Sequence, residues 1–166
     1  MFIDINPQLL NIIPLLSSEI QLCDATITSL HIPKYSCNDA DYTVFDLSRL
    51  TRIESIEIGD ECFESVKTFK INGLSRLKTI KIGKNSFTQK KNRNGNDKSK
   101  SFHILNCESL ESIEIGQYSF SDCAGDFELK NLPQLQSIQI GINENYSYNF
   151  FYSSFVIRGI EMILNT

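Results

Sequence analysis

Hydrophobic residues recur along this chain in short runs that repeat with a period near 24 residues. Four segments share the pattern F-x-(I/L)-x-x-(L/C)-x-x-(L/I)-x-(S/T)-I-x-I-G, and three of them continue to a second phenylalanine. They begin at Phe45, Phe69, Phe102 and Phe127, so their starts are 24, 33 and 25 residues apart. A period of roughly 20–50 residues is typical of solenoids and related arrays. We therefore expect a repeat protein in which each segment forms one coil.

Two runs in each repeat alternate between apolar and polar residues. One is F-x-I and the other is L-x-S-I-x-I-G. Alternation with a period of two, rich in β-branched residues and followed by glycine, predicts half-buried strands. No segment between Phe45 and Gly141 has the apolar spacing of a helix. The sequence therefore predicts a mainly β fold, a parallel β solenoid of about five coils of 24–25 residues with two short strands per coil, whose like strands stack about 4.8 Å apart.

The alternation also predicts which side chains face the core. In the third repeat, we expect Leu110, Ile113 and Ile115 to point inward, with Phe102, Ile104 and Phe120 closing the same coil. Their equivalents would stack above and below, because one coil cannot bury its apolar side alone.

The residue after the longer strand is glycine in four copies and Pro33 in a degenerate earlier copy, Ile27 to Cys37. Proline has a fixed negative φ and no N–H. If all copies share one turn, the glycines are not needed for a positive φ. We then expect a sharp turn in which the backbone N–H of this residue does not donate to the neighbouring strand. The alternative is that the first coil turns differently.

Two sequence elements resemble a known repeat family. L-x-x-I-x-I followed by a turn resembles the leucine-rich-repeat consensus L-x-x-L-x-L. Ile115 to Cys123 is similar to the I-G-x-x-A-F-x-x-C element of BspA-like leucine-rich repeats, and Leu30 to Pro33 is similar to their I-x-I-P element. The resemblance covers about residues 27–160. It departs from the family where glycine replaces proline in four copies and where F-x-I adds a second strand-like run.

The resemblance carries expectations about fold and function. It implies a curved solenoid of the leucine-rich-repeat type that binds proteins, often in adhesion at microbial surfaces, and it has no catalytic residues to transfer. On this basis we expect three regions. Residues 1–26 form an N-terminal cap or decayed repeat, 27–154 form the solenoid with an insertion at 88–101, and 155–166 form a truncated final repeat or C-terminal cap.

Composition narrows the class of protein. The chain has 166 residues, a net charge of −4 and a pI near 5.2, which argue against a dedicated nucleic-acid domain. It has no apolar run of transmembrane length. Its N-terminus lacks a basic region and contains Pro7 and Pro14, so it is a poor signal peptide. We assign no compartment: the default is intracellular, and the resemblance implies the cell surface if the chain is part of a longer protein.

The five cysteines favour buried free thiols. Their number is odd, and no C-x-x-C pair occurs to suggest zinc or a redox site. Free cysteine behaves as a small hydrophobic residue. We expect no metal and no cofactor.

Outward positions of the longer strand form columns of charge. One column contains Glu57, Lys81, Glu114 and Gln139, and the preceding one contains Glu54, Lys78, Glu111 and Gln136. On the shorter strand the equivalent residues are Asp46, Lys70, His103 and Glu128. One interpretation is a recognition face for another protein. The other is self-complementation, because opposite charges on neighbouring strands attract. The two are compatible.

The insertion at 88–101 is basic. It contains Lys90, Lys91, Arg93, Lys98 and Lys100 against Asp97. Its polar composition around Asn94-Gly95 predicts a protruding loop or hairpin. Functional interpretations are contact with an anionic partner, a nuclear signal or a membrane-surface contact. The alternative is a tolerated insertion kept soluble by its charge.

Residues 146–155 are unusually aromatic, with Tyr146, Tyr148, Phe150, Phe151, Tyr152 and Phe155. Some of these rings are expected to close the end of the core, and the alternative is an adhesive surface patch. Asn145-Tyr-Ser147 fits the N-glycosylation pattern.

No nucleophile–base set or phosphate-binding loop occurs, and we expect no enzyme activity and no small-molecule substrate. The sequence predicts a non-enzymatic protein–protein interaction module that presents the charged strand face. One alternative is a structural, self-associating, adhesin-like segment that pairs through open solenoid ends. A second alternative is an anionic partner bound by the basic loop.

Overall fold

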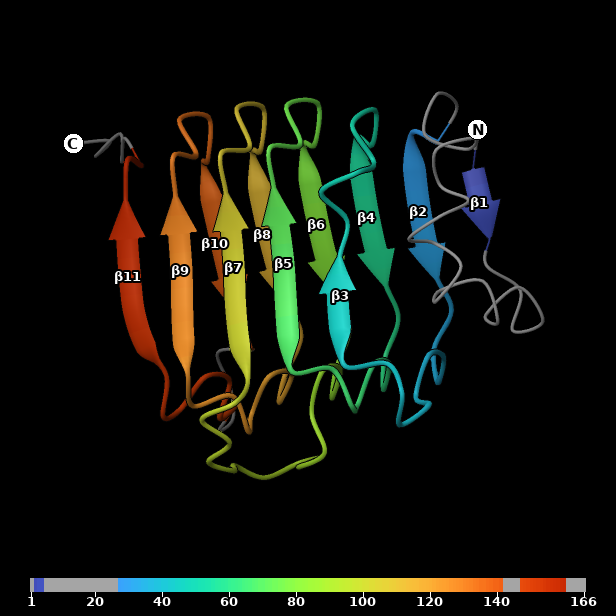
Figure 1. Ribbon diagram of the computed structural model, residues 1–166, viewed down its shortest axis with the longest axis vertical. Coiled ribbons are helices and arrows are strands. Elements are labelled where there is room, and N and C mark those ends of the chain that lie inside the picture. Colours follow the sequence, from blue (N-terminus) through green and yellow to red (C-terminus); the bar gives the residue numbers. More distant parts are fainter. Residues whose placement is uncertain (1, 5–26, 142–146, 161–166) are drawn as a thin grey trace.

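The computed structural model describes residues 2–4, 27–141 and 147–160, and they form two facing parallel sheets (Figure 1). The six-stranded sheet contains, in spatial order, β1 (Phe2–Asp4), β2 (Ser29–Ile32), β4 (Ser55–Ile58), β6 (Thr79–Ile82), β8 (Ser112–Ile115) and β10 (Ser137–Ile140). The five-stranded sheet contains β3 (Val44–Asp46), β5 (Thr68–Asn72), β7 (Ser101–Leu105), β9 (Asp126–Lys130) and β11 (Ser154–Arg158).

The predicted fold class is confirmed. The chain alternates between the two sheets, so that one strand from each makes a coil, and strands of the two sheets run in opposite directions (Figure 1). The result is an all-β solenoid of about five turns, and the described residues contain no helix. The half copy from Phe155 is also a strand, because β11 pairs with β9 in register.

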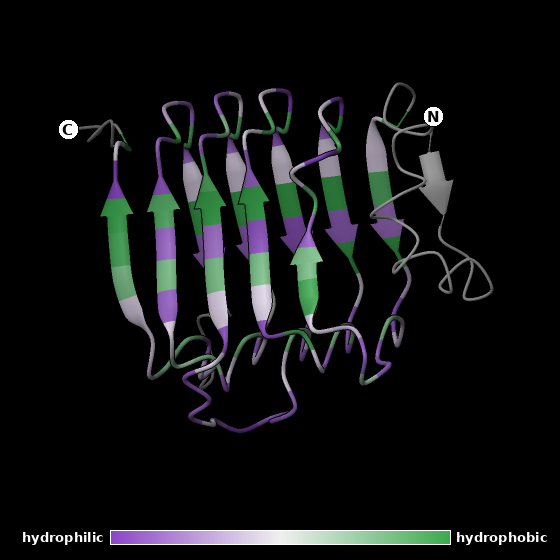
Figure 2. Cartoon of the chain, viewed as in Figure 1, coloured by the Kyte–Doolittle hydropathy of each residue, from purple (hydrophilic) through white to green (hydrophobic). Residues whose placement is uncertain are grey.

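The core lies between the sheets. All six side chains expected to point inward in the third repeat are buried, and apolar and polar residues alternate along the strands (Figure 2). Two ladders of phenylalanine run through this core. The first contains Phe45, Phe69, Phe102 and Phe127, and the second contains Phe63, Phe87, Phe120 and Phe150. Rings stack at 4.7–5.0 Å within a ladder and meet edge to face between ladders.

The second ladder depends on an uncommon backbone conformation. Phe63, Phe87, Phe120 and Phe150 all have positive φ, between 52° and 58°. A left-handed non-glycine residue costs about 1–2 kcal/mol. Each of these rings is buried against its neighbours, and burial of such a side chain contributes about 1.5–3 kcal/mol. Stacking of these buried rings therefore stabilises the left-handed turn. Local sequence preferences alone do not predict this conformation.

The glycines after the longer strands serve close approach between coils. Gly59, Gly83 and Gly116 do not have positive φ, as expected, whereas Gly141 has φ of +74°. A Cβ on Gly116 would fall 2.5 Å from the carbonyl carbon of Gly83. The prediction about the N–H is wrong, because Gly116 N donates to Ile82 O at 2.7 Å and the other three glycines donate in the same way. The glycine thus continues the ladder by one residue.

Four cysteines agree with the sequence prediction. Cys37, Cys62, Cys107 and Cys123 are buried and free, and burial raises the pKa of the Cys37 thiol to about 12. Cys23 lies outside the described residues, as does nearly all of the predicted N-terminal region 1–26 apart from β1.

We expect Ile113→Ala to destabilise the solenoid by about 2–5 kcal/mol, because it empties a fully packed site between two neighbouring coils. Urea denaturation followed by circular dichroism measures this loss. Ile138→Ala is the matched control, since Ile138 holds the same repeat position in the last complete coil but is exposed. It should cost less, and a loss below about 1 kcal/mol for Ile113→Ala would contradict the observed packing.

Candidate protein-binding face and basic loop

The predicted charged face lies on the outside of the six-stranded sheet. Its register is residue for residue, so Glu57 pairs with Lys81, Lys81 with Glu114, and Glu114 with Gln139. In the neighbouring column, Lys78 Nζ lies 3.4 Å from Glu54 Oε2. Of the eight predicted residues, Glu54 is half-buried and the other seven are exposed. The structure therefore brings the whole predicted set onto one surface.

The ion pairs on this face are exposed and long. Lys81 Nζ lies 3.9 Å from Glu114 Oε2, and roughly half of each of these two side chains is exposed. Exposed pairs of this kind contribute about 0.2–1 kcal/mol. Most of the charge therefore remains available to a partner, and cross-strand pairing and recognition are compatible.

Sequence analysis missed one member of the face. His31 aligns with Glu57 in the strand register, and its Nδ1 lies 3.4 Å from Glu57 Oε2. The signal was the match between S-L-H-I and S-I-E-I, which places His31 at the outward position of β2. A column of ionisable side chains thus extends along the face from β2 to β8.

The outer column of the five-stranded sheet is also observed. Lys70 Nζ lies 3.3 Å from Asp46 Oδ2, and His103 Nδ1 lies 3.5 Å from Glu128 Oε2. Strand pairing aligns Lys70 with both Asp46 and His103. Both outer faces of the solenoid therefore carry mixed charge.

The basic insertion projects from the end of the coils between β6 and β7 (Figure 1). It does not hang free, because it is hydrogen-bonded to the following coil. Thr88 Oγ1 lies 2.9 Å from Ser121 Oγ, and Gly95 N donates to Ser121 O at 3.0 Å. Asp97 N donates to Asp122 O at 2.8 Å. The prediction of a protruding loop is confirmed, and these contacts fix where it lies.

Lys100 was predicted to contact an anion, but the structure buries it. Its side chain is buried, and Nζ lies 3.1 Å from Oδ2 of the equally buried Asp122. The same ammonium donates to the carbonyl oxygens of Glu64 and Phe87, at 3.3 and 3.4 Å. Because its charge is neutralised inside the protein, Lys100 anchors the end of the loop.

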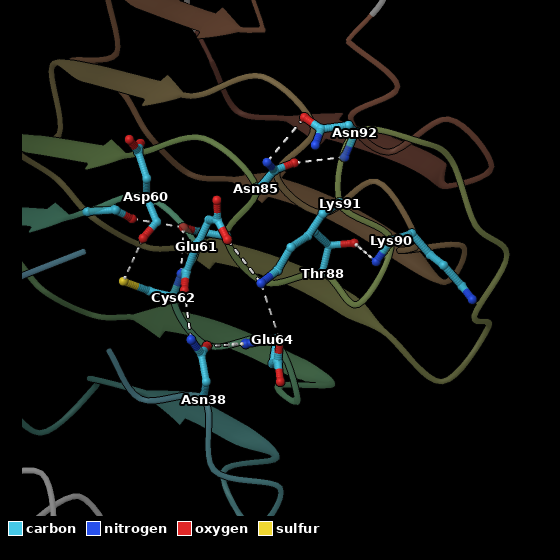
Figure 3. Close-up of polar contacts among 12 residues, drawn as sticks. Asn38, Asp60, Glu61, Cys62, Glu64, Asn85, Thr88, Lys90, Lys91 and Asn92 are labelled. Carbon is cyan, nitrogen blue, oxygen red and sulfur yellow. Dashed lines mark hydrogen bonds and ion pairs between the residues drawn. The ribbon is translucent and has the colours of Figure 1, made fainter. Parts of the chain in front are cut away.

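Lys91 is also engaged with the body of the solenoid (Figure 3). Its Nζ lies 3.0 Å from Glu61 Oε2 and 3.7 Å from Glu64 Oε2. The hydrogen bond and charge of Glu61 raise the pKa of Lys91. The other three bases of the loop are exposed: Lys90, Arg93 and Lys98. The surface that the loop offers to an anion is therefore smaller than its composition indicates.

The aromatic segment divides between core and surface. Phe150 is buried and stacks on Phe120 at 4.9 Å, so this ring belongs to the core. Phe151 and Tyr152 are exposed. Tyr152 OH accepts a hydrogen bond from Asn94 Nδ2 at 3.4 Å, which places an aromatic ring beside the basic loop. The sequence separation of 58 residues hid this contact. Asn145 and Tyr146 lie outside the described residues.

The described residues show no metal-binding group of three or more histidine, cysteine, aspartate or glutamate side chains. Within the same residues, no helix has the length and apolar character needed to cross a membrane. Comparison of the chain with protein-family models, curated proteins and solved structures finds no match.

Lys81→Glu should lower stability by about 0.2–1 kcal/mol, because it places three carboxylates on adjacent strands. The melting temperature at low salt measures the effect, which should shrink as salt is added. Gln139→Lys is the opposite control, since it sets a cation beside Glu114 and should leave the melting temperature equal or slightly higher. An unchanged melting temperature for Lys81→Glu at low salt would contradict the cross-strand attraction.

Lys100→Met should destabilise the protein by about 3–5 kcal/mol, because it leaves the buried Asp122 carboxylate without its counter-charge. Urea denaturation measures the loss. Lys98→Met removes an exposed lysine of the same loop and should change little. The double variant Lys100→Met/Asp122→Leu should recover part of the stability. Equal effects of the two single variants would rule out a structural role for the buried pair.

Proposed function

We propose that this chain is a non-enzymatic protein-interaction module whose partner docks on the outer face of the six-stranded sheet. The observation that carries the proposal is the in-register column of outward-facing ionisable side chains from His31 through Glu57 and Lys81 to Glu114. A fixed alternation of charge on a rigid sheet selects a partner by complementary potential and sets its register.

The polar character of this outer face supports the proposal. Parallel sheets in other folds are usually covered on both faces, and their strands are then apolar on both sides. Here the strands alternate, with isoleucine inward and charged or small polar residues outward, so the outer face is built for solvent or for a polar partner. Because each coil is held by its neighbours, a partner meets a preorganised surface and its binding orders little of this chain.

The size of the face indicates that a partner also contacts the flanking turns. Five strands spaced about 4.8 Å apart, each about 15 Å long, present only a few hundred Å². A stable complex usually buries about 800 Å² on each side. The turn that follows each strand continues the alternation, with Lys34, Asp60 and Lys84 exposed. We therefore include this turn column in the proposed binding surface.

The resemblance to BspA-like leucine-rich repeats is in keeping with protein binding, and membership of that family is part of the same proposal. A second candidate function is contact with an anionic partner through Lys90, Arg93 and Lys98. Its supporting observation is that these three bases are exposed on a loop tied to the solenoid, with Tyr152 beside it.

Site-specific photo-crosslinking tests the proposal and separates the two candidates. A benzoylphenylalanine is introduced at Glu114 on the proposed face, at Glu128 on the other sheet, or at Lys98 in the loop, and the chain is produced in its native cells. We expect a protein adduct of defined additional mass at position 114 that unlabelled chain competes away. Lys78→Glu/Lys81→Glu in the same chain should abolish it.

The control at position 128 has the same side chain on an equivalent outward position of β9. A protein adduct at 114 and none at 128 agrees with the proposed face. An adduct only at position 98 favours the loop instead. No adduct at 114, or equal adducts at 114 and 128, would refute docking on the six-stranded sheet.

A further inference from the structure

The charges on the outer face of the six-stranded sheet are sorted by coil. At matching outward positions, the charged residues along β4 are acids, those along β6 are bases, and those along β8 are acids again. We call these rows the first acidic stripe, the basic stripe and the second acidic stripe. Their members are, in this order, Glu54, Glu57 and Asp60, then Lys78, Lys81 and Lys84, then Glu111 and Glu114. Neighbouring stripes lie one strand spacing apart, about 4.8 Å, because the strands pair in register.

Contacts within one chain leave these stripes accessible. Lys78 Nζ lies 3.4 Å from Glu54 Oε2, and Lys81 Nζ lies 3.9 Å from Glu114 Oε2. More than half of each of these lysine side chains is nevertheless exposed, at 53% and 58%. Exposed ion pairs of this kind are weak. A partner that fits this face must therefore present the opposite order of rows, basic, acidic and basic, at the same spacing.

We propose that the partner is a second copy of this chain, packed face to face in a two-fold symmetric dimer. The axis runs parallel to the strands and passes between β4 and β6. Rotation about this axis keeps the position of each residue along its strand and reverses the order of the strands, so β4 faces β6 of the other copy and β2 faces β8. The inference rests on the proposed function, because it names the partner of the same surface.

This arrangement sets opposite charges over each other across the face. The first acidic stripe of each copy covers the basic stripe of the other, and symmetry makes this contact twice. Because Glu57 and Lys81 hold equivalent positions along their strands, Glu57 faces Lys81 of the second copy. The second acidic stripe lies over β2, whose outward residue is His31, so the Glu114 carboxylate meets an imidazole that can donate a hydrogen bond.

Small side chains between the charged columns let the two faces approach. The middle column of the face contains Ser55, Thr79 and Ser112. The two-fold axis places Ser55 over Thr79 of the other copy, where the two hydroxyl groups can hydrogen-bond. The longer charged side chains of both copies can therefore extend across the contact without a steric obstacle from this column.

The charges select this axis over others. An axis directly above β6 would lay the basic stripe on itself and the two acidic stripes on each other. An axis along the length of the solenoid would lay every stripe on itself. An axis between β6 and β8 would match two stripes but would place the first acidic stripe over the uncharged Ser137 and Gln139 of β10. Electrostatic complementarity therefore sets the register as well as the partner.

The size of the face predicts a weak dimer. The strand face offers a few hundred Å² per copy, an area typical of weak and transient complexes. Attraction between exposed charges holds the two copies together, and salt screens such attraction. We therefore expect a dimer that forms as the protein concentration rises and dissociates in high salt.

Light scattering behind size-exclusion chromatography, across a concentration series of the full chain, tests the dimer. In about 0.01 M salt, where charges act over about 30 Å, we expect the mass to rise toward twice the 18.9 kDa chain. The contact is isologous, so growth should stop at two chains. In about 1 M salt, where the screening distance falls to about 3 Å, the mass should stay at one chain.

Exchange of the stripe charges tests the register. One variant carries Lys78→Glu/Lys81→Glu, so its strands β4 and β6 both present acids, and another carries Glu54→Lys/Glu57→Lys, so both strands present bases. Each variant alone should have the mass of one chain in low salt. An equimolar mixture should regain the mass of two chains, because the altered row of each variant then lies over the opposite charge of the other. Interactions within a single chain do not change on mixing, so this recovery reports contact between copies.

Lys70→Glu is the matched control, because it reverses an outward lysine on β5 of the other sheet. This variant should dimerise as the unmodified chain does. Circular dichroism checks that all variants are folded.

Three results would overturn the dimer. They are a constant mass of one chain in low salt, a mass of two chains for either double variant alone, and a mixture of the two variants that stays at one chain. Photo-crosslinking at position 114 separates this failure from failure of the proposed function. An adduct with the additional mass of one chain supports both. An adduct of a different mass, together with a light-scattering mass of one chain, rejects the second copy but keeps docking on this face.

Discussion

The structure depends on in-register parallel pairing of successive coils. Each residue of one coil lies on the equivalent residue of the next, about 4.8 Å away. Aromatic rings at equivalent positions therefore stack, as Phe69 does on Phe102 at 4.7 Å. Turns at equivalent positions touch, which leaves no space for a Cβ on Gly59, Gly83 or Gly116. Like charges on equivalent positions would repel, and alternation of acid and base avoids this.

The same pairing determines where partners can bind. Along the sides of the solenoid, the backbone groups of each strand are hydrogen-bonded to the neighbouring coils. A partner on an outer face can therefore contact only side chains. At an end of such a stack, edge strands and apolar side chains lack a neighbouring coil. Among the described residues, β10 and β11 each pair on one side only, and their apolar side chains are partly exposed. A repeat protein thus has two kinds of surface: polar sides suited to selective docking, and apolar ends suited to continuation of the sheet.

The basic loop shows how an insertion is accommodated without disturbing the stack. Its first residue, Thr88, is buried against Ser121, and Lys100, near its other end, is buried against Asp122. Both contacts are made with the following coil. After the loop, β7 pairs in register with β5 and β9, as the strands of uninterrupted repeats do. Lys100, which composition assigns to the surface, therefore has a structural role. The loop offers three exposed bases besides the ion-paired Lys91, in place of five.

The sequence by itself determined the fold class, the strands, the inward residues and the charged columns, because period-two alternation in successive repeats leaves one register that buries the isoleucines of β4, β6 and β8. It also indicated buried free cysteines. Tertiary structure decided the positive φ of Phe63 and its equivalents, the burial of Lys100 and the contact of Asn94 with Tyr152. Each of these depends on what the neighbouring coil supplies, and a pattern read along one coil contains no information about its neighbour's side chains.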